Sequence, residues 1–231
     1  MGWRDIEAIW PPVILTLALA GVTTIILMAV GTPIAWWLAR SRWRGKEAVA
    51  AVVALPLVLP PTVLGFYLLL CLGPFGPGGW IAGLWGGRTL AFSFSGLVIG
   101  SVVYSLPFMV QPLRNGFAAI APELVDAAKT LGASSWQVFW ALAVPMARPA
   151  YVAGVVLSFA HTVGEFGLVL MIGGNIPGQT KVLSVAIYES VERLQWGRAH
   201  LLSLGLVGFA FAVILVVMLA DRRTARGMPA G

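Results

Sequence analysis

Long runs of apolar residues, separated by shorter stretches that hold most of the charges, dominate this sequence. An α-helix rises about 1.5 Å per residue, so about 20 apolar residues cross the hydrocarbon core of a bilayer. Five segments meet this requirement and predict spanning helices at residues 11–39, 48–72, 89–113, 149–172 and 200–220. The remaining segments are too short for a large soluble domain, so we expect an all-α membrane protein with one domain over residues 1–231.

The composition excludes the soluble and the disordered classes of protein. Hydrophobic residues make up 59% of the chain and charged residues only 10%, whereas soluble domains carry roughly 25% charged residues and disordered chains are rich in charge. The single cysteine, Cys71, excludes a disulfide framework, and the two histidines, His161 and His200, leave little material for a metal site. We therefore expect neither a metal nor another cofactor in this chain.

The basic residues are distributed unequally among the segments that connect the spans. Ten of the 15 Lys and Arg residues follow the first, third and last spans: Arg40, Arg42, Arg44, Lys46, Arg114, Lys129, Arg148, Arg222, Arg223 and Arg226. The positive-inside rule places these segments in the cytoplasm, with the N-terminus outside and the C-terminus inside. The net charge of +6 therefore indicates membrane orientation and not a nucleic-acid surface. Because acidic residues precede the first span, a retained helix fits better than a cleaved signal peptide.

Residues 113–148 form the one long cytoplasmic segment of this arrangement. Pro122 favours the start of a short helix. Glu123 and Asp126 suit its first turns, where the helix dipole stabilises negative charge. Gly132 stands where this helix would end in a left-handed conformation. The pattern predicts a short helix that stops abruptly at a glycine turn.

A second short helix is expected after this turn, with Ser134 or Ser135 as its N-cap. The small residues Ala127 and Ala128 allow the first helix to approach another backbone closely, which suits a helix that lies in the groove of a partner protein. An interfacial helix that lies on lipid headgroups is an equally good interpretation of the pattern alone.

The same segment resembles the EAA loop of ABC-importer permeases. The family pattern is Glu-Ala-Ala, three residues, Gly, nine residues and Ile-x-Leu-Pro. Here the corresponding residues are Asp126-Ala127-Ala128, Gly132 and Leu142-Ala143-Val144-Pro145. The spacing matches throughout, and Asp126, Leu142 and Val144 are conservative departures. The resemblance implies a coupling helix that docks on a separate ATPase, with coupling residues Glu123, Asp126, Ala127, Ala128, Gly132 and Pro145.

Three further stretches, residues 31–46, 55–69 and 161–188, look like the molybdate-transport permeases within this family. The resemblance implies a type I ABC-importer permease fold in the cytoplasmic membrane, a homodimer, two ATPase subunits that bind ATP and Mg²⁺, and an external substrate-binding protein. Sulfate and thiosulfate permeases share the Gly-Glu-Phe-Gly core at 164–167, whereas residues 175–178 are more typical of the molybdate branch. Molybdate is the expected substrate, with sulfate, thiosulfate and tungstate as alternatives.

Glu165 is the one formal charge within a predicted span. A carboxylate at the bilayer centre costs roughly 2.5–3.5 kcal/mol on insertion scales, so it should face protein or water. We consider two interpretations, a gate residue of the translocation path and a structural hydrogen-bond acceptor. His161 lies one turn earlier on the same face, and we expect an interior histidine because no second pair completes a metal site. Gly164 and Gly167 should loosen the helix here.

Three prolines, Pro56, Pro60 and Pro61, interrupt the second predicted span. Proline removes a backbone donor and kinks a helix, and the freed carbonyls must find protein or water partners within a membrane. The region is therefore a candidate lining of the translocation path, although a packing kink explains the prolines equally well. Together, the candidate path or gate residues are Pro60, Pro61, His161, Gly164, Glu165 and Gly167.

Two other patterns predict packing surfaces. Gly96 and Gly100, followed by Ser101 and Ser105, form a small-residue face on the third span, which fits close packing within the chain or between two copies. An apolar stripe on an external helix points to the outer leaflet or to an external partner. It consists of Leu183, Ile187, Val191 and Leu194.

Other functional classes fit the sequence less well. The chain has no GxxxxGK[ST] phosphate loop, so ATP hydrolysis would have to come from another subunit. An ion-coupled secondary transporter would show inverted repeats, which the five spans lack. An intramembrane enzyme would need a nucleophile with a base in reach, and no convincing pair is present. We therefore expect a non-catalytic permease subunit.

Overall fold

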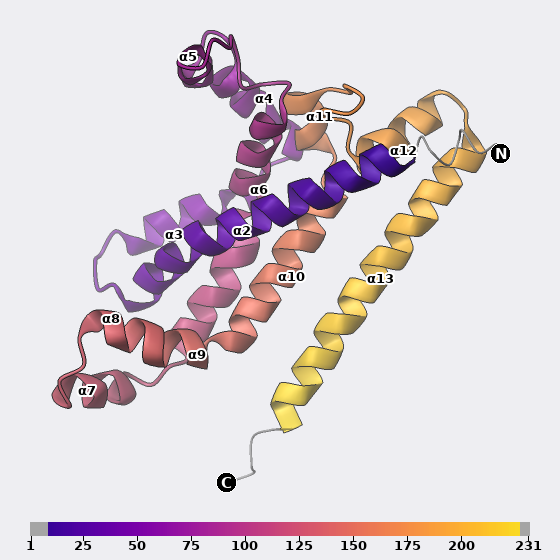
Figure 1. Ribbon diagram of the computed structural model, residues 1–231. Coiled ribbons are helices and arrows are strands. Elements are labelled where there is room, and N and C mark those ends of the chain that lie inside the picture. The colour runs from indigo at the N-terminus through magenta and orange to yellow at the C-terminus, as the bar shows by residue number, and fades with distance from the viewer. Residues whose placement is uncertain (1–8, 227–231) are drawn as a thin grey trace.

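A computed structural model describes residues 9–226, with side chains through residue 215. The acidic residues that precede the first predicted span, Asp5 and Glu7, lie outside the described residues. The described part is built from helices (Figure 1): α2 (Trp10–Arg40), α3 (Lys46–Ala54), the 3₁₀ turn η1 (Leu55–Leu57), α4 (Pro61–Leu72), α5 (Pro77–Gly83), α6 (Phe94–Ala118), α7 (Pro122–Thr130), α8 (Ser135–Gln137), the π-helical η2 (Val138–Ala143), α9 (Val144–Met146), α10 (Arg148–Gly164), α11 (Gly167–Gly173), α12 (Leu183–Glu192) and α13 (Trp196–Arg226).

Three helices in the described part are long and apolar enough to cross a bilayer alone, namely α2, α6 and the 196–215 part of α13. Two bent pairs raise the number of crossings to as many as five. One pair joins 46–57 to 61–72 with a bend of 107°, and the other joins 135–146 to 148–164 with a bend of 70°. The prolines of the second predicted span thus break it into two helices.

Helix boundaries differ from the expected ones, most clearly in the third and fourth spans, and α13 also extends past both ends of the span expected at 200–220. Helix α6 begins at Phe94 and continues to Ala118, so residues 113–118, expected in the cytoplasmic segment, are helical and belong to α6. Its start is late because the backbone N–H groups of Leu90 and Ala91 both donate to the carbonyl of Leu72, which holds this stretch as a connection. The expected span 149–172 consists of two helices, α10 and α11.

Helix α6 lies at the centre of the bundle, between α2 and α10 (Figure 1). Met109 on α6 is fully buried. A Cβ atom added at Gly31 of α2 would lie 2.8 Å from Met109 Cγ, and one added at Gly154 of α10 would lie 2.9 Å from Met109 Sδ. The two glycines therefore allow both neighbouring helices to pack closely against Met109, as small residues do in membrane bundles.

The small-residue face of α6 packs within this chain. A Cβ atom at Gly100 would lie 2.2 Å from Ile172 Cδ1 and 2.9 Å from Leu168 Cδ2, both on α11. The side chains of Leu168 and Ile172 are fully buried. Of the two alternatives left open by the sequence, intrachain packing explains Gly100.

The two ends of the bundle differ in character (Figure 1). Helices α7, α8 and α9 lie at one end, near α3 and the C-terminal end of α2. Helices α5, α11 and α12 lie at the opposite end. The basic stretch 40–46 connects α2 to α3 and so shares an end with α7–α9. Helix α13 begins beside α12 and runs from that end toward the end that holds α7–α9.

Candidate functional site: a capped end segment and two adjoining helix breaks

The first candidate region is the end segment, defined here as residues 119–147. Its first helix, α7, begins at Pro122 and is followed by Gly132, whose φ of +91° is the left-handed conformation expected from the sequence. Ser134, and not Ser135, caps α8 with a capping box. Gln137 N donates to Ser134 Oγ at 3.2 Å, and Ser134 N donates to Gln137 Oε1 at 2.8 Å. The two predicted helices and the glycine turn are confirmed.

The end segment presents an exposed surface away from the bundle. Glu123, Asp126 and Ala127 are exposed on α7, whereas Ala128 and Pro145 are partly buried. The side chain of Leu131 is 89% exposed. A shallow cavity of about 410 Å³ opens beside it. It is lined by Ala128, Leu131, Gly132, Ala133, Gln137, Val138, Ala141 and Leu142.

An aromatic base fixes this segment to the ends of the long helices. The ring of Trp36 on α2 lies 5.2 Å from that of Phe117 on α6 and 5.3 Å from that of Phe139 on η2, both edge-on. The guanidinium of Arg40 lies over the same Trp36 ring and donates to the carbonyl of Ile120 at 3.1 Å. A displacement of the end segment would therefore act directly on α2 and α6. These contacts join distant parts of the chain, so the sequence alone does not predict them.

The second candidate region is formed by two adjoining helix breaks. Pro60 caps α4 in an extended conformation and Pro61 starts it, while α10 stops at Gly164 and α11 starts at Gly167. A Cβ atom at Gly167 would lie 3.1 Å from Pro61 Cβ, so the two breaks are in contact. The two segments whose backbone is not helical therefore lie next to each other in the membrane domain.

Glu165 lies within the second of these breaks and is only 4% exposed. Its Oε2 accepts a hydrogen bond from Ser101 of α6 at 2.9 Å, and its backbone carbonyl accepts one from Ser184 of α12 at 2.5 Å. Among the described residues, Oε1 has no hydrogen-bond partner. The residue thus joins α6, the break and α12, and it keeps one oxygen free for another donor.

His161 contacts the same helix one turn further along. Its Nδ1 lies 2.9 Å from Oγ of Ser105, and its ring stacks on Phe108 with 4.0 Å between centroids. Ser101 thus contacts Glu165 and Ser105 contacts His161, and the two residues of each pair on one segment are four positions apart. That double i, i+4 match was the signal in the sequence that could have identified the two serines as partners. Among the described residues, no three His, Cys, Asp or Glu side chains lie close enough to share a metal ion.

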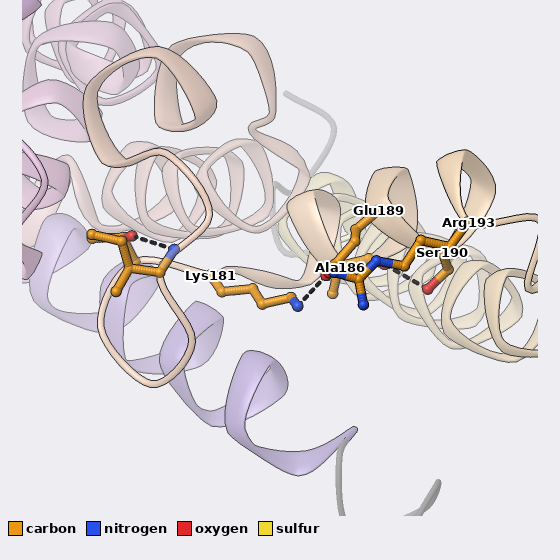
Figure 2. Close-up of polar contacts among 7 residues, drawn as sticks. Lys181, Ala186, Glu189, Ser190 and Arg193 are labelled. Atoms are coloured by element: carbon orange, nitrogen blue, oxygen red, sulfur yellow. Dashed lines mark hydrogen bonds and ion pairs between the residues drawn. The ribbon is translucent and has the colours of Figure 1, made fainter.

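An ion cluster holds the connection between α11 and α12 (Figure 2). The carboxylate of Glu189 forms an ion pair with Lys181 and another with Arg193, the latter at 2.7 Å. Burial by itself would raise the pKa of the Glu189 carboxyl, but hydrogen bonding and the charge of Lys181, the charge of Arg193 and a hydrogen bond from Asn175 together hold this pKa below its usual range. The cluster therefore stays ionised in mildly acidic solution.

We expect this cluster to protect the 174–182 connection in a pH-dependent way. Because the folded pKa of Glu189 is lowered, its stabilising effect is complete above the ordinary glutamate pKa of about 4.3 and is lost as pH falls through the lower folded value. Hydrogen exchange of residues 174–182, corrected for intrinsic rates, should show this loss. Glu189→Gln should lack the protection at every pH, and Glu192→Gln serves as the control. A Glu189→Gln variant with wild-type protection would contradict the assignment.

The apolar stripe predicted on α12 divides into two parts. Leu183 is buried and Ile187 packs with it against Leu202 of α13. Val191 is 41% exposed. Leu194 is 69% exposed and lies beyond the end of α12 at Glu192 with a φ of +57°, so the predicted stripe does not continue to it on the helix. The first half of the stripe is therefore an internal contact between α12 and α13. The sequence alone does not place α13 against this part of α12.

The described part is thus a bundle of apolar helices with an exposed capped segment at one end and two adjoining helix breaks, as expected for a multi-pass membrane protein. The family model for the binding-protein-dependent transport system inner membrane component matches residues 31–226. The chain belongs to this family, and it is a multi-pass component of the inner membrane.

Curated relatives cover nearly the whole chain. The molybdenum transport system permease protein ModB of Azotobacter vinelandii is 54% identical over 93% of this chain and 94% of its own length. The protein of the same name from Escherichia coli K12 is 35% identical over 90% and 91%. A probable sulfate transport system permease protein, cysT of Zygnema circumcarinatum, is 30% identical over 93% of this chain and 76% of its own length.

Solved structures confirm the predicted fold. A chain of the MetNI methionine ABC transporter in an inward-facing conformation superposes with a TM-score of 0.74 at 17% identity and covers 99% of this chain and 100% of its own. A bacterial ABC transporter involved in alginate import gives a TM-score of 0.72 at 18% identity, over 99% and 85%. The fold is that of the type I ABC-importer permeases.

Proposed function

We propose that this chain is the permease subunit of an ABC importer that carries molybdate across the cytoplasmic membrane. The observation that carries the proposal is the near full-length similarity to two molybdenum permeases, which exceeds the similarity to the sulfate permease. The sequence Asn175-Ile176-Pro177-Gly178, which resembles the molybdate branch, supports the same proposal. The fold by itself does not select the substrate, since the two solved relatives carry unlike ones.

The energy for transport comes, in this proposal, from a separate ATPase that binds ATP and Mg²⁺. The exposed helix α7 and the adjacent cavity form the docking surface, through Glu123, Asp126, Ala127 and Leu131. Amphipathic helices that lie in a groove commonly recognise partners in this way. Two copies of the chain form the pore, and each receives one ATPase subunit. The aromatic base at Trp36 passes the movement of the docked segment to the long helices.

The adjoining helix breaks form the gate of the path in this proposal. Pro60, Pro61 and Gly167 supply the contact between the broken spans. Gly164 ends α10 and frees the backbone around Glu165. Irregular backbone at membrane depth is tolerated where it is buried in protein or lines a water-filled cavity. A movement that separated the two breaks would open such a cavity without unfolding either helix.

The end segment faces the cytoplasm in this proposal, and helices α5 and α12 face outward. The basic stretch 40–46 shares the end of the bundle that holds α7–α9, in agreement with the positive-inside rule. In a Cys71→Ser background, an impermeant maleimide should label Gly178→Cys in intact cells and should not label Arg44→Cys until the membrane is permeabilised. Labelling of residue 44 in intact cells would reverse the orientation.

Reconstituted transport tests the function. The chain, its ATPase and its binding protein are placed in vesicles, and uptake of labelled molybdate is measured with and without ATP. We expect uptake of molybdate that depends on ATP and that tungstate reduces. A large excess of sulfate should leave this uptake nearly unchanged. Uptake of sulfate at a comparable rate would assign the chain to the sulfate branch. Uptake without the ATPase would indicate a secondary transporter.

A further inference from the structure

An apolar groove of about 660 Å³ lies between α2 and the segment that leads from α8 into α10. Its lining comes from Ile25, Met28, Ala29, Thr32, Pro33, Trp136, Phe139, Trp140, Val144 and Tyr151. The one aliphatic hydroxyl among them, that of Thr32, donates to the carbonyl of Met28 at 2.6 Å and is satisfied within its own helix. A volume of this size accommodates a small organic ligand, and the lining favours an apolar chain.

The groove runs from the middle of a spanning helix to the end of the bundle. Its α2 side, from Ile25 to Pro33, belongs to the most apolar of the three helices that are long enough to cross a bilayer alone in the described part of the chain. Its other side is formed by η2 and by Trp136 and Trp140, which are 70% and 51% exposed and contact each other edge-on at 5.5 Å. Exposed tryptophans on a membrane protein concentrate at the level of the lipid headgroups. The groove therefore extends from that level into the hydrocarbon region.

A basic residue, Arg148, begins the helix that supplies one residue of the groove lining. Arg148 is the first residue of α10, one helical turn before Tyr151, which lines the groove. Its side chain is exposed, and no ion pair or hydrogen bond to it is found among the side chains described through residue 215. A negative group from outside the chain would complete this arrangement.

We propose that an anionic glycerophospholipid of the adjacent leaflet occupies this groove, with an acyl chain along α2 and its phosphate at Arg148. The apolar lining and the interfacial tryptophans select a lipid chain, and the unpaired arginine selects a negative headgroup. The bound lipid contacts Phe139 and Trp140 on one side and α2 on the other, and so fills the space between the end segment and the first helix. The inference is independent of the substrate that the protein carries.

Quenching of tryptophan fluorescence tests the proposal directly. The purified full-length chain in neutral detergent is titrated with phosphatidylglycerol or phosphatidylcholine that carries dibrominated acyl chains, since bromine quenches tryptophan on contact. We expect a saturable component with phosphatidylglycerol that disappears in the Trp136→Phe/Trp140→Phe double variant. Arg148→Gln should weaken phosphatidylglycerol binding about fivefold and bring it to the level of phosphatidylcholine. Arg44→Gln removes an equal charge elsewhere and should change nothing.

A matched pair on α2 separates the groove from general contact with detergent and lipid. Ala29→Phe places a ring in the groove and should remove the saturable component, whereas Val30→Phe adds a ring at the adjacent exposed position outside the lining and should retain it. Equal binding of the two lipids by the wild type, or equal behaviour of the two phenylalanine variants, would overturn the proposal. So would efficient disulfide formation between two Ile25→Cys chains in a Cys71→Ser background, which would show that a second copy fills the groove.

Discussion

Replacement of Gly132 by valine should weaken binding of the ATPase while the membrane helices form normally. Gly132 has a φ of +91°, and a β-branched residue adopts such a conformation only at a cost of order 1–3 kcal/mol. Because a Cβ atom at this position meets no atom within 4 Å, the whole cost is backbone strain. We expect α7 to reorient against the capped α8, because this relieves the strain. If the full cost of about 1–3 kcal/mol is needed to restore the docked orientation, ATPase affinity falls about five- to 150-fold.

Pull-down of the ATPase and substrate-stimulated ATP hydrolysis measure this effect. Gly178→Val is the matched control, since Gly178 also has positive φ and open space around its Cα but lies in the connection before α12. Gly132→Asn should restore much of the binding, because asparagine tolerates left-handed conformations. Equal ATPase recovery with Gly132→Val and Gly178→Val would remove the end segment from the docking surface.

Glu165→Gln should reduce transport at least tenfold while the yield of assembled protein stays within about twofold of wild type. Glutamine keeps the shape of the side chain and an oxygen that accepts from Ser101, so the contact between α6 and the break persists. The second oxygen, Oε1, has no partner among the described residues. A buried unpaired acceptor costs about 1–3 kcal/mol, and we infer that another conformation of the transport cycle supplies its donor. In glutamine an NH₂ group replaces this oxygen, and an NH₂ group cannot accept a hydrogen bond from that donor.

Uptake and complex yield must be measured on the same preparations. Glu192→Gln makes the same chemical change on the exposed side of α12, where the carboxylate accepts from Tyr188 at 2.7 Å, and should leave uptake nearly unchanged. Ser101→Ala removes the other side of the Glu165 contact and should lower yield as well as uptake. A Glu165→Gln protein that transports normally, or one that fails to assemble, would assign the residue to structure alone.

Local features of this fold could be predicted from the sequence because each depends on a few neighbouring residues. The glycine turn at Gly132 and the cap at Ser134 follow from backbone preference and from a side chain that reaches only three residues along. The breaks at Pro61 and at 164–167 follow from proline chemistry and from two glycines. Hydrophobic runs of membrane length gave the membrane class for the same reason.

Contacts between distant segments could not be predicted in this way. The hydrogen bond from Ser184 to Glu165 joins residues 19 positions apart, and nothing near Ser184 specifies its partner. The bond from Ser101 spans 64 positions, and only the equal spacing of Ser101 and Ser105 with His161 and Glu165 hints at it. The glycine face at Gly100 was compatible with a second copy or with α11, and only the packed structure selects α11. The π-helical turn at 138–143 has no composition signal, although it places Phe139 against Trp36.

The site of energy input is tested most directly by cross-linking from position 131. Leu131 is 89% exposed beside the glycine turn, and in a Cys71→Ser background Leu131→Cys is the one reactive thiol of the chain. A short bismaleimide should join it to a surface cysteine of the ATPase in membranes that contain both subunits, with a yield that changes when ATP is added. Gly178→Cys at the opposite end should give no such product. Cross-linking of the ATPase to residue 178, or no product at residue 131, would contradict the account.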